Sequence, residues 1–179
     1  SGIACALGFS EASKINYREG LIKNRYVHRS FIQPGNEQRK ATISEKLNPV
    51  KELVEGKRVV LVDDSVVRGN TSRRIVQRVR DAGATEVHLR VGCPPIISPC
   101  FLGIDMPNRE EFIAPNRTVE EIRNEIGADS VAYVSIPGLV ESIGKKEKDL
   151  CLGCITENYP LPIEGERQRG QATLEDFEI

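Results

Sequence analysis

Short β-branched apolar runs alternate along the chain with segments whose apolar residues recur at helical spacing. Such runs are typical of strands buried inside parallel sheets, because both faces of those strands are covered. Some helical segments carry end signals, such as Thr118 and Glu121 in capping-box spacing. The alternation predicts an α/β fold, with a parallel sheet flanked by helices and joined by right-handed crossovers. Strands are predicted at 58–62, 86–91 and 131–134, and helices at 71–82, 118–127 and 137–143.

The first third of the chain is less regular. Residues 3–12 are apolar and free of proline, which favours a helix, and residues 17–22 are predicted to form a short strand. Residues 23–48 are polar, and a connection of this length inside a domain is usually a functional lid or disordered. The chain starts at Ser1 with no methionine and no preceding strand, so we expect a fragment or a processed chain.

Composition limits the functions that the chain can have. Its 179 residues amount to about one domain, and 39% hydrophobic with 28% charged residues allow a packed core. The formal net charge of −1 gives no support to a nucleic-acid binder, whose signature is a basic surplus. No apolar run approaches the ~20 residues of a membrane span, and no signal segment opens the chain. We therefore expect a cytoplasmic protein without nucleic-acid or membrane partners.

The first of the three predicted strands ends at two adjacent carboxylates, Asp63 and Asp64. Ligands of open α/β sheets bind beyond the carboxyl ends of the strands. Gly69, Thr71 and Ser72 then bring backbone N–H groups and hydroxyls to a helix N-terminus, where the helix dipole favours an anion. An anion cradle beside two acceptor carboxylates fits a phosphorylated sugar with a diol, bound directly or through Mg²⁺. The simpler interpretation, a helix cap, needs only one of the two acids.

Four stretches of the sequence resemble one enzyme family. VVLVDDSVVRGNTS is similar to the phosphoribosyl pyrophosphate (PRPP) motif of type I phosphoribosyltransferases. GLIKNRYVHRSFIQP, CPPIISPCFLGIDMP and CLGCITENYP resemble amidophosphoribosyltransferases, which make 5-phosphoribosylamine from PRPP and glutamine at the first committed step of purine biosynthesis. The resemblance implies a type I phosphoribosyltransferase domain at 1–144 that lacks its first strand and the family's glutaminase domain. It also implies a C-terminal extension at 145–179 with a C-x-x-C pair.

The same resemblance implies roles for residues in three parts of the chain. The implied PRPP-binding residues are Asp63, Asp64, Ser65, Arg68, Gly69, Asn70, Thr71 and Ser72. The implied magnesium ligands are Ser1, Asp63 and Asp64. The implied catalytic residues, on a loop that closes over PRPP, are Lys23, Arg25 and Tyr26. Tyr26 and Ile32 would also wall an ammonia path, and His28 stands where the family has a glycine.

The five cysteines raise a separate question about metal binding. By its spacing alone, the pair at Cys151 and Cys154 could hold zinc or an iron–sulfur cluster, act as a redox pair, or be there by chance. The resemblance implies a [4Fe–4S] cluster held by Cys100, Cys151 and Cys154, with the fourth ligand outside this chain. Cys5 and Cys93 match no ligand of the family, so both are interpreted as buried thiols.

The resemblance also implies ligands, partners and an assembly. We expect PRPP, glutamine-derived ammonia and purine nucleotide inhibitors as ligands, and a homo-oligomer as the assembly, while the chain by itself would be weakly active or inactive. One alternative is a regulatory domain that senses PRPP without catalysis, but such a domain has no need of the KNRY stretch together with the cysteines. The other is a phosphoribosyltransferase that salvages a nucleobase, which would lack the C-x-x-C pair and carry a base-specific hood.

Overall fold

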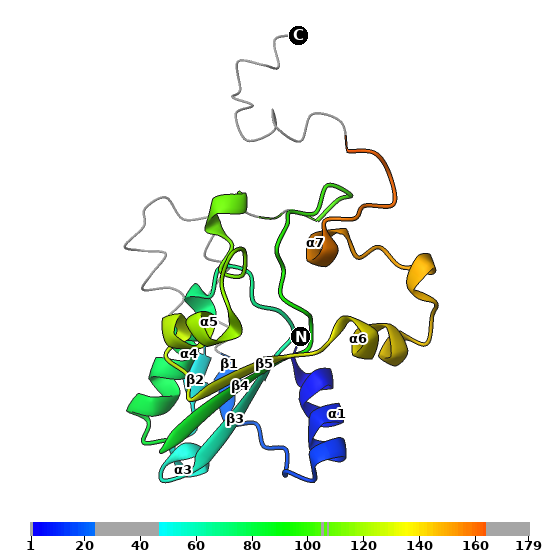
Figure 1. Ribbon diagram of the computed structural model, residues 1–179. Coiled ribbons are helices and arrows are strands. Elements are labelled where there is room, and N and C mark those ends of the chain that lie inside the picture. Colours follow the sequence, from blue (N-terminus) through cyan, green and yellow to red (C-terminus); the bar gives the residue numbers. More distant parts are fainter. Residues whose placement is uncertain (1, 24–46, 105, 107, 164–179) are drawn as a thin grey trace.

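A computed structural model describes residues 2–23, 47–104, 106 and 108–163 (Figure 1). Its centre is a three-stranded parallel sheet in the order β3-β4-β5. The strands are β3 (Arg58–Asp63), β4 (Glu86–Val91) and β5 (Ser130–Tyr133). Each lies within one residue of its predicted bounds, because the β-branched runs mark strands that the sheet buries. The register places Asp63 beside Val91 and Val91 beside Tyr133, so the three strands end at one edge of the sheet.

Two amphipathic helices, α4 (Asn70–Asp81) and α5 (Val119–Ile126), cover one face of the sheet (Figure 1). Their predicted positions are confirmed, and the capping box at Thr118 and Glu121 is formed. Strand β4 alternates half-buried and buried residues, as expected when one face of a strand packs on helices. The buried side chains of this core include Val76, Val79, Val87, Leu89, Ile122 and Ile126. Burying a side chain of this size contributes about 1.5–3 kcal/mol, so this core fixes α4 firmly against the sheet.

The first helix, α1 (Ile3–Ser13), lies on the opposite side of the sheet, against β3 (Figure 1). The predicted helix at 3–12 is therefore confirmed. The helix is apolar on all sides, yet none of its residues is buried. Ile3 and Leu7 are 59% and 50% exposed. Because a helix that is apolar all round is normally buried, α1 presents an apolar surface that the described residues leave uncovered.

A small antiparallel pair of strands, β1 (Leu21–Lys23) and β2 (Leu47–Pro49), precedes the main sheet. The strand predicted at 17–22 thus begins later than expected, and β2 was not predicted. Leu-Asn-Pro has no alternating pattern, so only pairing with β1 makes it a strand. Arg78 of α4 holds β2 by donating to the Leu47 carbonyl (2.6 Å). A short helix, α3 (Lys51–Val54), leads into β3.

The C-terminal part forms a second, smaller apolar cluster. Its helices are η2 (Arg109–Glu111), α6 (Ile136–Ile143), η3 (Glu147–Asp149) and α7 (Gly153–Thr156). Phe112 and Ile155 are buried there together with Ile96. This shared packing joins the cysteine-containing extension to the segment after β4. The rings of Phe101 and Tyr159 meet edge to face with centroids 5.1 Å apart. Every helix in the described ranges is too short or too polar to cross a lipid bilayer.

Candidate functional site

The carboxyl end of β3 carries the predicted carboxylate pair. Asp63 is the last residue of the strand, and the Asp64 backbone N–H donates to Asp63 Oδ1 (3.0 Å). Both residues are half-buried. Burial raises the pKa of Asp63 to about 6. A side-chain hydrogen bond with Asp64 and the charge of Asp64 raise this pKa further, whereas the bond from the Asp64 backbone N–H lowers it. Two adjacent carboxylates that are partly removed from water therefore favour a cation or a donor-rich ligand at this point.

Helix α4 begins directly after the carboxylates, at a tight bend. Its N-cap, Gly69, adopts a left-handed φ of +73°. A Cβ at Gly69 would collide with Cδ1 of Ile113, a core side chain that is 2% exposed. Among the described residues no side chain caps this helix end, and its first turn carries no acidic residue. The N–H groups of the first turn thus form an anion-binding end beside Asp63 and Asp64.

A second helix N-terminus, that of α1, lies against the same end of β3. A Cβ at Gly2 would lie only 2.8 Å from the Val62 carbonyl oxygen, so glycine allows this approach. Gly92, the residue after β4, has a similar role, since a Cβ there would lie 2.6 Å from Cys5 Sγ. The Gly92 N–H donates to the Asp63 carbonyl (2.9 Å). The N-terminus of α1 thus lies against Asp63, and that of α4 follows Asp64 by six residues along the chain; neither helix has an acidic first turn.

The structure describes some of the predicted site residues and leaves others outside the described ranges. Those from Asp63 to Ser72 form one continuous bend, in which Ser72 is buried and Ser65 is half-buried. Lys23 is exposed at the end of β1. Five residues singled out in the sequence lie outside the described residues: Ser1, Arg25, Tyr26 and Ile32, for which the family resemblance implies roles, and His28, which differs from the family's glycine. Gly92, Glu111 and Ile113 contact this bend or strand end but were missed, because they belong to segments without a sequence motif.

The predicted cluster cysteines come near one another without forming a ligand set. The Cys154 carbonyl accepts N–H donations from Ile97 (2.9 Å) and Ser98 (3.1 Å), which brings α7 beside the segment that leads to Cys100. Burial raises the pKa of Cys154, and the nearby thiols of Cys100 and Cys151 raise it further. However, the described part of the chain contains no group of three or more His, Cys, Asp or Glu residues that could hold a metal ion.

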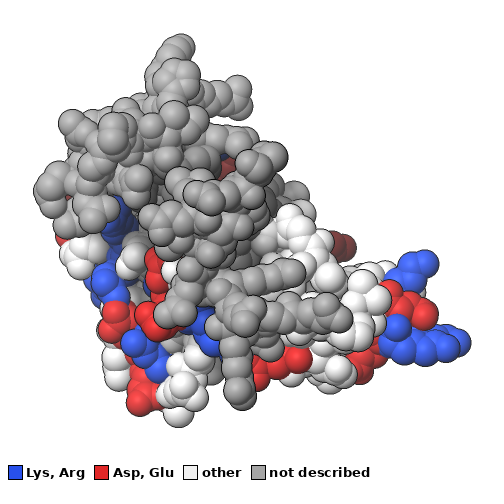
Figure 2. All heavy atoms as spheres, turned by 90° about the horizontal axis from the view of Figure 1, so that it is seen from above, with Lys and Arg blue, Asp and Glu red and all other residues white. Residues whose placement is uncertain are grey.

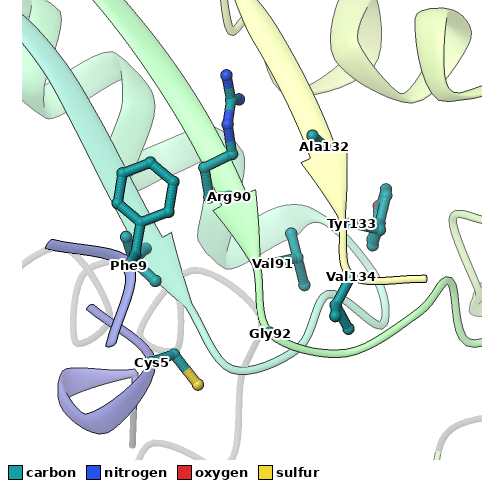
Figure 3. Close-up of a pocket in the computed structure, with 9 residues that line it drawn as sticks. Cys5, Phe9, Arg90, Val91, Gly92, Ala132, Tyr133 and Val134 are labelled. Atoms are coloured by element: carbon teal, nitrogen blue, oxygen red, sulfur yellow. The ribbon is translucent and has the colours of Figure 1, made fainter. Parts of the chain in front are cut away.

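The two cysteines interpreted as buried thiols are half-buried instead. Cys5 lines a cavity of about 260 Å³ between α1 and the ends of β4 and β5 (Figure 3). Figure 3 shows Cys5 and Phe9 on one side and Tyr133 and Val134 on the other. Cys93 lies near Cys154 and Asp64, and burial raises its pKa to about 11. No local sequence pattern predicts this cavity, because it lies between elements that are distant along the chain.

Both positively and negatively charged residues lie on the described part of the surface that is seen from above. Figure 2 shows Lys and Arg side chains interleaved with Asp and Glu there. Some exposed charged side chains of the protein form ion pairs, such as Arg58 with Glu86 (2.8 Å) and Arg68 with Glu111 (2.8 Å). Exposed pairs of this kind contribute about 0–1 kcal/mol each, so they affect local geometry more than overall stability.

Comparison with known proteins finds a family match that includes the carboxylates. Residues 22–95 match the family described as phosphoribosyl transferase domain. This part of the chain is thus similar to a phosphoribosyl transferase domain. This domain spans β1 to the segment after β4, and therefore includes the carboxylate pair and the bend before α4. The type I phosphoribosyltransferase fold implied by the sequence is thereby confirmed.

The relatives that match this chain over most of its length are amidophosphoribosyltransferases. It is 60% identical to the enzyme of Methanocaldococcus jannaschii over 96% of this chain and 36% of the relative. It is 54% identical to that of Bacillus subtilis over 91% and 35%. The solved B. subtilis glutamine PRPP amidotransferase, complexed with ADP and GMP, superposes with a TM-score of 0.80 at 53% identity, covering 92% of this chain and 37% of that one. The chain thus spans about a third of the length of these relatives.

Proposed function

We propose that this chain is the PRPP-binding part of an amidophosphoribosyltransferase. The observation that supports this proposal is the position of Asp63 and Asp64 between the N-termini of α1 and α4. PRPP is a ribose with a phosphate at one end and a pyrophosphate at the other. Two anion-binding helix ends with acceptor carboxylates between them match that distribution of charge and hydroxyl groups.

In this proposal, each part of PRPP binds a different part of the protein. The bend from Arg68 to Ser72 surrounds the 5-phosphate, and the backbone N–H groups and the hydroxyls of Thr71 and Ser72 donate to it. Asp63 and Asp64 accept hydrogen bonds from the ribose hydroxyls. The N-terminus of α1 faces the pyrophosphate, and Lys23 at the end of β1 adds a positive charge.

The reaction needs charge stabilisation more than acid–base chemistry. Ammonia attacks the anomeric carbon with its lone pair, the bond to pyrophosphate breaks, and pyrophosphate leaves with the bonding electrons. The ammonium that forms loses a proton to give 5-phosphoribosylamine. Asp63 and Asp64 fit Mg²⁺, because carboxylate oxygens are its usual ligands, and the ion would supply positive charge at the pyrophosphate. The protein's own contribution is to orient the ribose and to exclude water, which competes with ammonia.

The test is PRPP binding followed by product analysis. Titration of this chain with PRPP and Mg²⁺ should give saturable binding, measured by calorimetry. In the full-length protein, PRPP with ammonia should yield phosphoribosylamine and pyrophosphate. Incorporation of a free nucleobase would favour a salvage enzyme instead, and binding without any product would favour a PRPP sensor. A chain that binds neither PRPP nor ribose 5-phosphate would contradict the proposal.

Purine nucleotides are further ligands that we propose for this site. The solved B. subtilis relative is described as complexed with ADP and GMP. A nucleoside monophosphate shares a ribose and a 5-phosphate with PRPP, so the α4 bend and the carboxylates suit both ligands. GMP should therefore compete with PRPP on this chain. Simultaneous binding of both at saturation would show that the nucleotide has a separate site.

We also propose that the longer protein binds an iron–sulfur cluster. It is supported by the C-x-x-C spacing and by the contact of Cys154 with the segment before Cys100. The thiols are not arranged as ligands in the described residues, so no step of the reaction depends on the cluster here. Iron and sulfide analysis of the anaerobically purified full-length protein tests it. Cys151→Ser should lower the iron content, whereas Cys93→Ser, the matched control, should leave it unchanged.

A further inference from the structure

Residues Glu111 to Ile113 hold the bend before α4 through three different contacts. The guanidinium of Arg68 donates to both carboxylate oxygens of Glu111, at 2.8 Å from Nε and 3.1 Å from an Nη atom. The Ile113 N–H donates to the Val67 carbonyl (2.8 Å). The Ile113 side chain fills the space in front of Gly69, where a Cβ would collide with it. Three consecutive residues of the bend are thus held by one segment that lies over forty positions later in the chain.

The segment that carries Glu111 is itself fixed to the protein. Glu111 ends the helix η2, and Arg109 at the start of η2 donates to Ser98 Oγ (3.0 Å) and pairs with Glu157. Ser98 is fully buried. Ile113 belongs to the main core at 2% exposure. Glu111 therefore acts from a rigid support, so its ion pair restricts the position of Arg68.

We propose that Glu111 is a positioning residue of the phosphate site, which keeps the Arg68 side chain paired outside the bend while Ile113 sets the backbone beneath it. This inference rests on the proposed function and deepens it. This bidentate pair occupies the Nε–Nη edge of the Arg68 guanidinium, one of the two N–H edges with which it would otherwise grip a phosphate. The 5-phosphate is then bound by backbone N–H groups and hydroxyls of the first turn of α4, and Arg68 shapes the bend without touching the ligand.

The test compares ligands that differ in which end of the site they occupy. Binding of ribose 5-phosphate and of inorganic pyrophosphate to this chain is measured by calorimetry in Mg²⁺. Glu111→Ala should weaken ribose 5-phosphate binding about fivefold, the upper end for an exposed ion pair, and leave pyrophosphate binding within twofold. Arg58→Ala is the matched control, because it removes an exposed pair of the same length from the other end of β3. This control should change neither affinity, and melting temperatures show that each variant is folded.

A charge exchange separates positioning from direct contact with phosphate. In the double variant Arg68→Glu with Glu111→Arg the ion pair is restored with reversed sign, so ribose 5-phosphate affinity should return to within about twofold of the original. If the exchange binds as poorly as Glu111→Ala, or worse, Arg68 itself contacts the phosphate and the inference is wrong. Unchanged affinity in Glu111→Ala would overturn it as well. If the unaltered chain binds neither ligand, the proposed function fails first, which is a distinguishable result.

Discussion

The two helix ends that flank Asp63 and Asp64 are held in place by different physical means. Helix α4 buries Ser72, Val76 and Val79 against the sheet, so the hydrophobic core positions its N-terminus. Helix α1 buries none of its residues, and it makes two close glycine contacts, Gly2 against β3 and Gly92, just after β4, against Cys5. Elements with few buried side chains open at a lower free energy than core elements. The phosphate half of the site is therefore built into the core, whereas the α1 half depends on close backbone approach.

The carboxylate pair serves both halves, so its loss should have the largest effect. Asp63→Asn with Asp64→Asn removes two charged acceptors, each worth about 1.5–3 kcal/mol when hydrogen-bonded to a ligand. PRPP affinity should fall by at least about a hundredfold. Calorimetric titration in Mg²⁺ measures this change. Unchanged PRPP affinity in a folded double variant would refute the role that we assign to the pair.

The core-supported half should respond sharply to Gly69→Ala. The added methyl would collide with Ile113 and force a left-handed φ on alanine, which together lower the free energy of unfolding by about 2–5 kcal/mol. Ribose 5-phosphate binding should weaken more than tenfold, and the melting temperature should drop. Combining Gly69→Ala with Ile113→Val, which removes the colliding methyl, should recover part of the melting temperature. No recovery would mean that backbone strain alone accounts for the loss.

The α1 half should respond more mildly to Gly92→Ala, because a half-exposed helix can move. The new methyl would lie 2.6 Å from Cys5 Sγ, and a shift of α1 relieves that contact. We expect pyrophosphate affinity to fall about threefold to tenfold, with ribose 5-phosphate affinity nearly unchanged. Cys5→Ala in the same chain removes the sulfur and should restore binding. A drop in ribose 5-phosphate affinity equal to that for pyrophosphate would show that the two halves are not independent.

The smallest predicted effect concerns stability and pH without metal. The pKa of Asp63 is about 6 in the fold against an ordinary value of 3.8, so the folded state binds its proton more tightly than the unfolded state. Ionised Asp63 therefore destabilises the fold at pH 7, and stability falls as pH rises from 3.8 to 6. Asp63→Asn should raise the melting temperature by a few degrees at pH 7.5 in EDTA, and this gain should vanish below pH 4. An equal gain at both pH values would exclude burial of charge as the cause.

Local patterns were sufficient for most of the fold. The strands at β3, β4 and β5 and the helices α1, α4, α5 and α6 follow from apolar periodicity and end signals, which act over a few residues. β2 escaped prediction because Leu47–Pro49 becomes a strand only by pairing with β1. The second apolar cluster was equally hidden, since Ile96, Phe112 and Ile155 come from three separate stretches.

The sequence by itself determined the chemistry of the site. Asp63, Asp64 and the bend to Ser72 are contiguous, so the order of residues alone places carboxylates beside a helix N-terminus. Only the tertiary structure decided what supports them. Gly2 and Gly92 bring α1 to the end of β3, and Glu111 and Ile113 hold the bend. Those contacts join residues from about thirty to ninety positions apart, and close packing between distant segments depends on the whole core, which no local pattern encodes.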